Sequence, residues 1–214
     1  MTTPSIEYGV LSPMLIVFAV AVAGVLVEAF GSSRTRYGTQ MVLSLSGLVA
    51  AFIAVVRNYA TIGAGQPAAV AAVAVDRPAL MLQGTIVLFA IVGVLLIGER
   101  RRDSDSAAAG LDAFTPQASS IPGSLAEKTA TKAAIAQTEV FPLTMFAVGG
   151  MMLFPAAGDL LTMFIALEVF SLPLYLMCGL ARHRRLLSQE ASLKYFLLGA
   201  FSSAFFLYGM ALIY

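Results

Sequence analysis

The sequence predicts an all-α, polytopic integral membrane protein with six transmembrane helices. Hydrophobic residues make up 59% of the 214 positions, charged residues 12%, and the mean hydropathy is +0.86. The apolar residues are grouped in runs of about 20, the length of helix that crosses a hydrocarbon layer about 30 Å thick. These runs lack the alternating pattern of a membrane β-barrel. The composition also excludes an ordinary soluble domain.

The six expected spans form two groups that are separated by a polar segment. Residues 1–99 contain the first three spans, and residues 137–214 contain the other three. Residues 100–136, whose middle is rich in Ser, Ala, Asp and Pro, are predicted to be a cytoplasmic linker. An S-x-x-E capping box at 124–127 predicts a helix that starts near Leu125. The spans are expected at 11–30, 38–56, 79–97, 140–157, 160–181 and from 191 to the end.

The positive charges predict the orientation of these spans. The second and fourth loops carry one arginine each, Arg57 and Arg77. By the positive-inside rule, the first, third and fifth loops are then cytoplasmic and the N-terminus is outside. The first residues lack the basic n-region of a cleaved signal peptide. Ten positive residues lie in the odd-numbered loops: Arg34, Arg36, Arg100, Arg101, Arg102, Lys128, Lys132, Arg182, Arg184 and Arg185.

Several kinds of site are excluded by the residue inventory. A net charge of +1 does not favour nucleic-acid binding. The single histidine, His183, cannot supply a bis-histidine haem site, and the single cysteine, Cys178, is expected to be a buried, inert thiol. No CxxC pair or phosphate-binding glycine motif occurs. We therefore expect no metal or cofactor site in this chain.

Glu168 is the candidate functional residue, because it lies near the middle of the fifth span. A carboxylate at a helix centre costs about 2.5–3.5 kcal/mol on insertion scales, and such residues usually mark ion pathways. The structural alternative is a carboxylate that a neighbouring helix satisfies without turnover. Pro173, five residues on, removes a backbone donor and predicts a helix kink that leaves the Val169 carbonyl open.

Lys194 is the only cation that we expect within a span, and its depth leaves two interpretations open. It could take part in a proton relay with Glu168, or its ammonium group could extend to the membrane surface. The acids at span ends, Glu28, Asp76, Glu139 and Asp159, are expected to be solvated or to cap helices. The small-residue pairs Gly199–Ser203 and Ala200–Ala204 are interpreted as packing contacts.

Two stretches resemble one protein family. They are DLL…LEVFSLPLY at 159–175 and QEASLKYFLLGAF at 189–201. Their sequences are similar to those of subunit N, an antiporter-like subunit of the proton-pumping NADH–quinone oxidoreductase, respiratory complex I. The resemblance implies that Glu168 is the glutamate that pairs with lysines of later helices, and that Lys194 is the lysine of the KY motif. Family members are longer and contain inverted helix repeats, so the resemblance implies an N-terminal fragment that ends within the first repeat.

The resemblance implies a role in proton translocation coupled to quinone reduction, through Glu168 and Lys194. Asp159, Glu139 and Asp76 are secondary candidates for that path. NADH, FMN, iron–sulfur clusters and quinone would be bound by other subunits, and the partners would be other membrane-arm subunits and the lipid of the cell (inner) membrane. The alternatives are a subunit of a multi-subunit cation/proton antiporter and a non-catalytic scaffold fragment.

Overall fold

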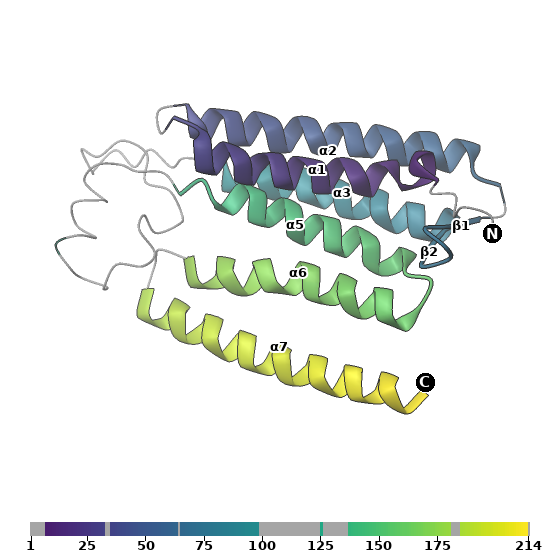
Figure 1. The fold of residues 1–214 in the computed structure, drawn as a ribbon. Helices are drawn as coiled ribbons and strands as arrows, with labels where there is room; N and C mark the ends of the chain where they lie inside the picture. The colour runs from purple at the N-terminus through teal and green to yellow at the C-terminus, as the bar shows by residue number, and fades with distance from the viewer. Residues whose placement is uncertain are drawn as a thin grey trace.

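The computed structural model describes residues 7–32, 35–63, 65–98, 137–180 and 185–213, together with the single position Leu125. In these residues six α-helices lie side by side, and successive helices run in opposite directions (Figure 1). This arrangement confirms the predicted all-α polytopic class. The helices are α1 (Tyr8–Phe30), α2 (Arg36–Thr61), α3 (Arg77–Ile97), α5 (Val140–Leu153), α6 (Leu160–Leu180) and α7 (Arg185–Ile213).

Five of these helices are long and apolar enough to cross a membrane: α1, α2, α3, α6 and α7. They coincide with five of the six expected spans, but α2 extends beyond its apolar run at both ends and α7 begins six residues before 191. Backbone hydrogen bonding continues a helix into polar sequence, so hydropathy underestimates its length. The proposed linker and the helix start near Leu125 lie outside the described residues, apart from Leu125 itself, which is helical.

The fourth expected span, 140–157, coincides with an apolar helix that is shorter than the other five. The apolar helix there covers Val140–Ala156, and its last turn, η1 (Phe154–Ala156), is a 3₁₀ helix. Pro155 lacks an N–H group and cannot continue the α-helical hydrogen bonds, so the α-helix passes into a 3₁₀ turn, and the backbone becomes extended at Ala157. Helix α5 lies inside the bundle (Figure 1), packed against α1, α3 and α6, and the backbone just beyond its end bonds to the segment between α2 and α3.

A small hairpin that the sequence did not predict covers that end. Strands β1 (Gln66–Ala68) and β2 (Val73–Val75) pair antiparallel, with Gln66 opposite Val75. Val73 also bridges to Ala157, and the Gly158 N–H donates to the Ala72 carbonyl at 2.8 Å. The second and fourth connections therefore lie at the same end of the bundle, as the expected alternation requires. Three-residue strands are too short to show a period in the sequence.

Close helix contacts in the bundle are made at glycines. A Cβ at Gly24 would lie 3.1 Å from Pro142 of α5, and one at Gly47 would lie 2.5 Å from Val20 of α1. A Cβ at Gly150 of α5 would lie 2.6 Å from the Phe170 backbone nitrogen of α6. Small residues let two helix backbones pack closely, which matters in a membrane because the hydrophobic effect does not drive helices together there.

Helix α7 lies on the outer side of the molecule, against α6 (Figure 1). Most of its side chains are exposed. On α6, Cys178 is exposed too, so the expectation of a buried thiol is wrong. In a membrane protein an apolar run faces lipid as readily as protein, and hydropathy therefore does not predict which of its residues are buried.

Glu28 links three helices at the end of the bundle that holds the first loop. Its Oε1 accepts from Arg36 Nη1 of α2 at 2.9 Å, and its Oε2 accepts from Thr138 Oγ1, just before α5, at 2.7 Å. The fully buried Gln40 donates to Oε2 at 3.3 Å and to the Gly24 carbonyl at 2.8 Å. Glu28 is therefore neither a solvated acid nor a helix cap.

We expect Gly150→Ala to destabilise the bundle, because its Cβ would press on α6 backbone that has no rotamer by which to move away. Overpacking of this kind costs about 1–3 kcal/mol. The matched control is Gly93→Ala on α3, where a Cβ meets nothing within 4 Å. Unfolding of the purified protein in a denaturing detergent titration measures both variants. Equal stability of the two would contradict the close α5–α6 contact.

We expect Glu28→Gln to lower the free energy of unfolding by about 1–3 kcal/mol, since it leaves the mostly buried Arg36 without its counter-charge. Glu190→Gln on α7 is the control, because its ion pair with Lys194 is exposed and such pairs contribute little. The same detergent titration separates them. A loss confined to Glu190→Gln would refute the link.

Candidate functional site at the interface of α6 and α7

Glu168 lies in the middle part of α6 and faces α7. It is eight residues, or about 12 Å, from Leu160 and twelve residues, or about 18 Å, from Leu180. Its side chain is half-buried. Its Oε1 accepts a short hydrogen bond from Ser203 Oγ of α7. The charge predicted from the sequence is therefore satisfied across a helix interface.

Contacts on both sides of this bond set the register of the two antiparallel helices. Toward the start of α6, the rings of Phe164 and Phe206 stack at a centroid distance of 6.0 Å. Toward its end, a Cβ at Gly199 would lie 1.8 Å from the Tyr175 hydroxyl oxygen, so the ring of Tyr175 occupies that space. Ser192 Oγ donates to the Tyr175 carbonyl at 2.6 Å. Ser203 is thereby placed opposite Glu168.

The surroundings of Glu168 carry no compensating charge among the described residues. Helix α5, which packs on the other side of α6, contains no ionisable side chain, and neither does η1. No described lysine or arginine forms an ion pair with Glu168; the described ion pairs join Glu28 to Arg36 and Glu190 to Lys194. Among the described residues, the Glu168 carboxylate thus has one hydrogen-bond donor, the neutral Ser203 hydroxyl.

Pro173 lies inside α6 without ending it, since the helix is continuous to Leu180. Ser171 Oγ donates to the Leu167 carbonyl at 2.5 Å, a local bond of the kind that often bends helices. Pro173 itself cannot donate to the Val169 carbonyl, which is the group that the sequence marked as open. The kink stays a prediction.

The structure does not bring Lys194 to Glu168. Lys194 and Ser203 are nine residues apart, which is two and a half helical turns and about 13 Å along α7. They therefore lie on opposite faces: Ser203 is 8% exposed, whereas the Lys194 side chain is 68% exposed. Lys194 Nζ instead pairs with Glu190 Oε1 one turn earlier, at 2.5 Å.

The secondary candidates lie at helix ends. Asp76 accepts from the Ala79 N–H at 2.8 Å and Asp159 accepts from the Thr162 N–H at 2.6 Å, so the predicted capping role is confirmed for both. Glu139 accepts from Gln137 Nε2 at 2.8 Å at the start of α5. None of the three contacts Glu168 in the described hydrogen bonds.

Ser203 is the residue that sequence reasoning missed. The Gly199–Ser203 spacing was interpreted as packing, and the structure shows that its two positions differ. Gly199 makes the close contact with Tyr175, whereas the Ser203 hydroxyl bonds to the carboxylate. A polar residue within an apolar span was the available signal, but Ser202 beside it carries the same signal and is exposed.

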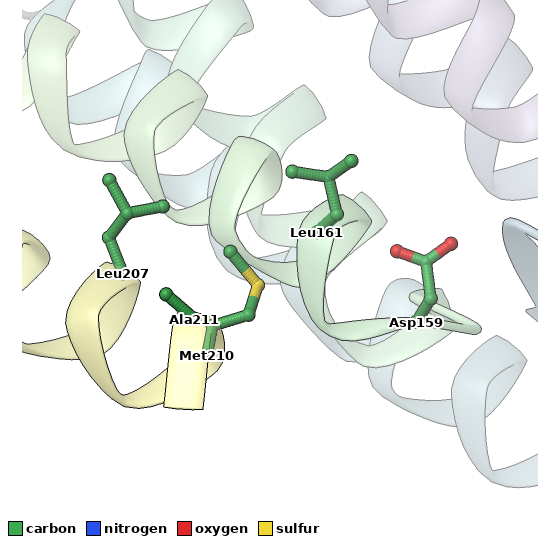
Figure 2. Close-up of a pocket in the computed structure, with 5 residues that line it drawn as sticks. All are labelled: Asp159, Leu161, Leu207, Met210 and Ala211. Carbon is green, nitrogen blue, oxygen red and sulfur yellow. The ribbon is translucent and has the colours of Figure 1, made fainter. Parts of the chain in front are cut away.

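A cavity of about 390 Å³ lies further along the same interface, between the start of α6 and the end of α7. Leu161 comes from α6, whereas Leu207, Met210 and Ala211 come from α7; Asp159 lies at the α6 end (Figure 2). Its walls are mainly apolar, and Glu168 does not line it. Within the described part of the chain, no three His, Cys, Asp or Glu residues are grouped as a metal site would require.

Comparison with known proteins finds matches to one family. Residues 157–214, which include α6 and α7, match the transmembrane family described as NADH:quinone oxidoreductase/Mrp antiporter. A solved structure described as respiratory complex I from Thermus thermophilus with bound aureothin is similar at a TM-score of 0.65 and 28% identity. That match covers 94% of this chain and 36% of the solved one.

Curated relatives match almost the whole chain. The NADH-quinone oxidoreductase subunit N of Rhodococcus opacus is 64% identical over 99% of this chain and 41% of the relative. That of Mycobacterium tuberculosis is 61% identical over 99% and 42%, and subunit N 3 of Streptomyces griseus is 54% identical over 100% and 39%. The chain thus spans about two fifths of the length of these relatives. At this level of identity over its whole length, the chain belongs to the subunit N family of the NADH–quinone oxidoreductases.

Proposed function

We propose that this chain acts, as part of a longer subunit, in proton translocation by the membrane arm of a proton-pumping NADH–quinone oxidoreductase. The observation that supports this most is the half-buried Glu168 carboxylate, which has a neutral donor and no described counter-charge. Such a group gains and loses a proton more readily than one held in an ion pair. Glu168 is the proposed proton carrier.

Lys194 is the proposed second charged group of this path. Its exposed position on α7 leaves its ammonium group accessible from outside the described bundle, and its bond to Glu190 is of the weak surface type. A charge relay from Glu168 to Lys194 would have to pass around α7, through water or through another part of the subunit. Asp159, Glu139 and Asp76 are the proposed secondary candidates for this path, and Asp159 and Asp76 also cap helices.

The redox chemistry is proposed to take place in other subunits. NADH, FMN, iron–sulfur clusters and quinone would bind there, and the chain would pack against other membrane-arm subunits in the cell membrane. The N-terminus and the β1–β2 hairpin would face outward, with the first, third and fifth loops in the cytoplasm.

A cation/proton antiporter subunit is the second candidate, because the matching family model includes antiporters by its description. The relatives at 54–64% identity favour the oxidoreductase. Both candidates use an intramembrane carboxylate, so they differ in what drives the proton. Dependence of proton movement on NADH oxidation, rather than on a sodium gradient, separates them.

Glu168→Gln in the full-length subunit should stop proton translocation, since the amide cannot bind the transferred proton. In the assembled complex in liposomes, we expect pumping driven by NADH to fall by about a hundred-fold, the lower end of what a positioned proton-transfer group contributes. Glu7→Gln, an exposed carboxylate before α1, is the matched control. A pH-sensitive dye measures the rate. Normal pumping by an assembled Glu168→Gln complex would overturn the proposal.

Cysteine labelling tests the orientation. Cys178→Ser, together with replacement of any cysteine in the rest of the subunit, provides a background for Val70→Cys at the exposed hairpin tip and Ser32→Cys after α1. In intact cells, a membrane-impermeant maleimide should label Val70→Cys and spare Ser32→Cys. Permeabilised cells should show both labelled. The reverse pattern in intact cells would place the N-terminus in the cytoplasm.

A further inference from the structure

Ser203 is set directly against Glu168 by the packing of α7 on α6. Its hydroxyl donates to Glu168 Oε1, and its side chain is 8% exposed. Ser202, the next residue along the same helix, is exposed. The two serines therefore have the same side chain on the same helix, but Ser203 is hydrogen-bonded to the Glu168 carboxylate whereas Ser202 is exposed.

No other described side chain on the packed elements offers Glu168 a charge. Helix α5 and η1 contain no ionisable residue. On α6 itself, Tyr175 and Cys178 follow Glu168 by seven and ten residues, or about 10 and 15 Å along the helix. On α7, Lys194 bonds to Glu190 on the opposite face, and Tyr195 packs edge-on against Tyr175. Ser203 is thus the described side chain that hydrogen-bonds the carboxylate.

A hydroxyl suits a carboxyl group that changes its protonation state. It carries one donor and two acceptor lone pairs, and it rotates to present either. It donates to the ionised carboxylate, and it accepts from the protonated carboxyl group. A lysine offers donors alone. Because a buried polar group left without a partner is costly, a partner that serves both states keeps the side chain in one place.

We propose that Ser203 is a positioning residue for Glu168, which holds the carboxyl group at the α6–α7 interface in both its protonated and its ionised state. The inference rests on the proposed function, since it concerns the group that would carry the proton. Two contacts keep α6 and α7 in the register that the hydrogen bond needs: Phe164 stacks on Phe206, and the ring of Tyr175 packs against Gly199.

The test compares Ser203→Ala with Ser202→Ala in the full-length subunit of the assembled complex. Loss of one hydrogen bond to a charged group corresponds to roughly a ten-fold change, so we expect NADH-driven pumping by Ser203→Ala to fall about ten-fold. Ser202→Ala should pump normally, and Ser203→Thr, which keeps the hydroxyl, should recover most of the rate. Equal rates in the two alanine variants would overturn the inference.

Infrared difference spectroscopy supplies a readout that a purely structural role would not move. The C=O stretch of protonated Glu168 is identified by its disappearance in Glu168→Gln. In Ser203→Ala this band should move, because the protonated carboxyl group loses the hydroxyl to which it is hydrogen-bonded. An unchanged band would overturn the inference even if pumping fell. Should Ser203→Ala fail to assemble, Ser203→Cys, a weak donor of similar size, should also move the band.

The two proposals fail separately. Normal pumping by Glu168→Gln removes Glu168 as a proton carrier and with it the role of Ser203. Loss of pumping in Glu168→Gln, together with an unchanged rate and band in Ser203→Ala, removes the role of Ser203 and leaves the proton carrier in place.

Discussion

A carboxylate inside hydrocarbon has to be satisfied by the protein, because lipid offers it no hydrogen-bond donor. Among the described residues, that requirement is met by the bond between Glu168 of α6 and Ser203 of α7. The bond depends on the register of two helices, which the Phe164–Phe206 stack and the close approach at Gly199 set on either side. The pairing of α6 with α7 thus positions the candidate site.

The same requirement is met differently at the end of the bundle. Glu28 has a charged partner, Arg36, and accepts from two neutral donors, Gln40 of α2 and Thr138 just before α5. Glu28 is held by a counter-charge, whereas the described partner of Glu168 is a neutral hydroxyl. The two acids therefore illustrate how the partner, rather than the acid, separates a structural role from a proposed transfer role.

The apolar helix that α5 forms with η1 is shorter than its neighbours. Its α-helical part ends in the 3₁₀ turn that holds Pro155, and the β1–β2 hairpin segment pairs with the backbone beyond it, at Ala157 and Gly158. This pairing satisfies polar backbone groups where the helix stops. The short central helix also brings α6 against the bundle through Gly150, so the site helix is anchored on a charge-free surface.

The sequence by itself determined the helical class, the position of five spans and the depth of Glu168, because apolar runs and a charge within them are local properties of the chain. The family was predicted from the sequence motifs within residues 159–201, and the comparisons confirmed it. The sequence did not predict which side chains contact one another. Glu168 meets Ser203 rather than Lys194, Glu28 meets Arg36 and Thr138, and Cys178 faces outward, because these outcomes depend on the rotation and register of whole helices. Only the tertiary structure decided them. Ser203 and Lys194, for example, are nine residues apart on α7 and lie on its buried and its exposed face, and the hydropathy of the helix does not distinguish these two faces.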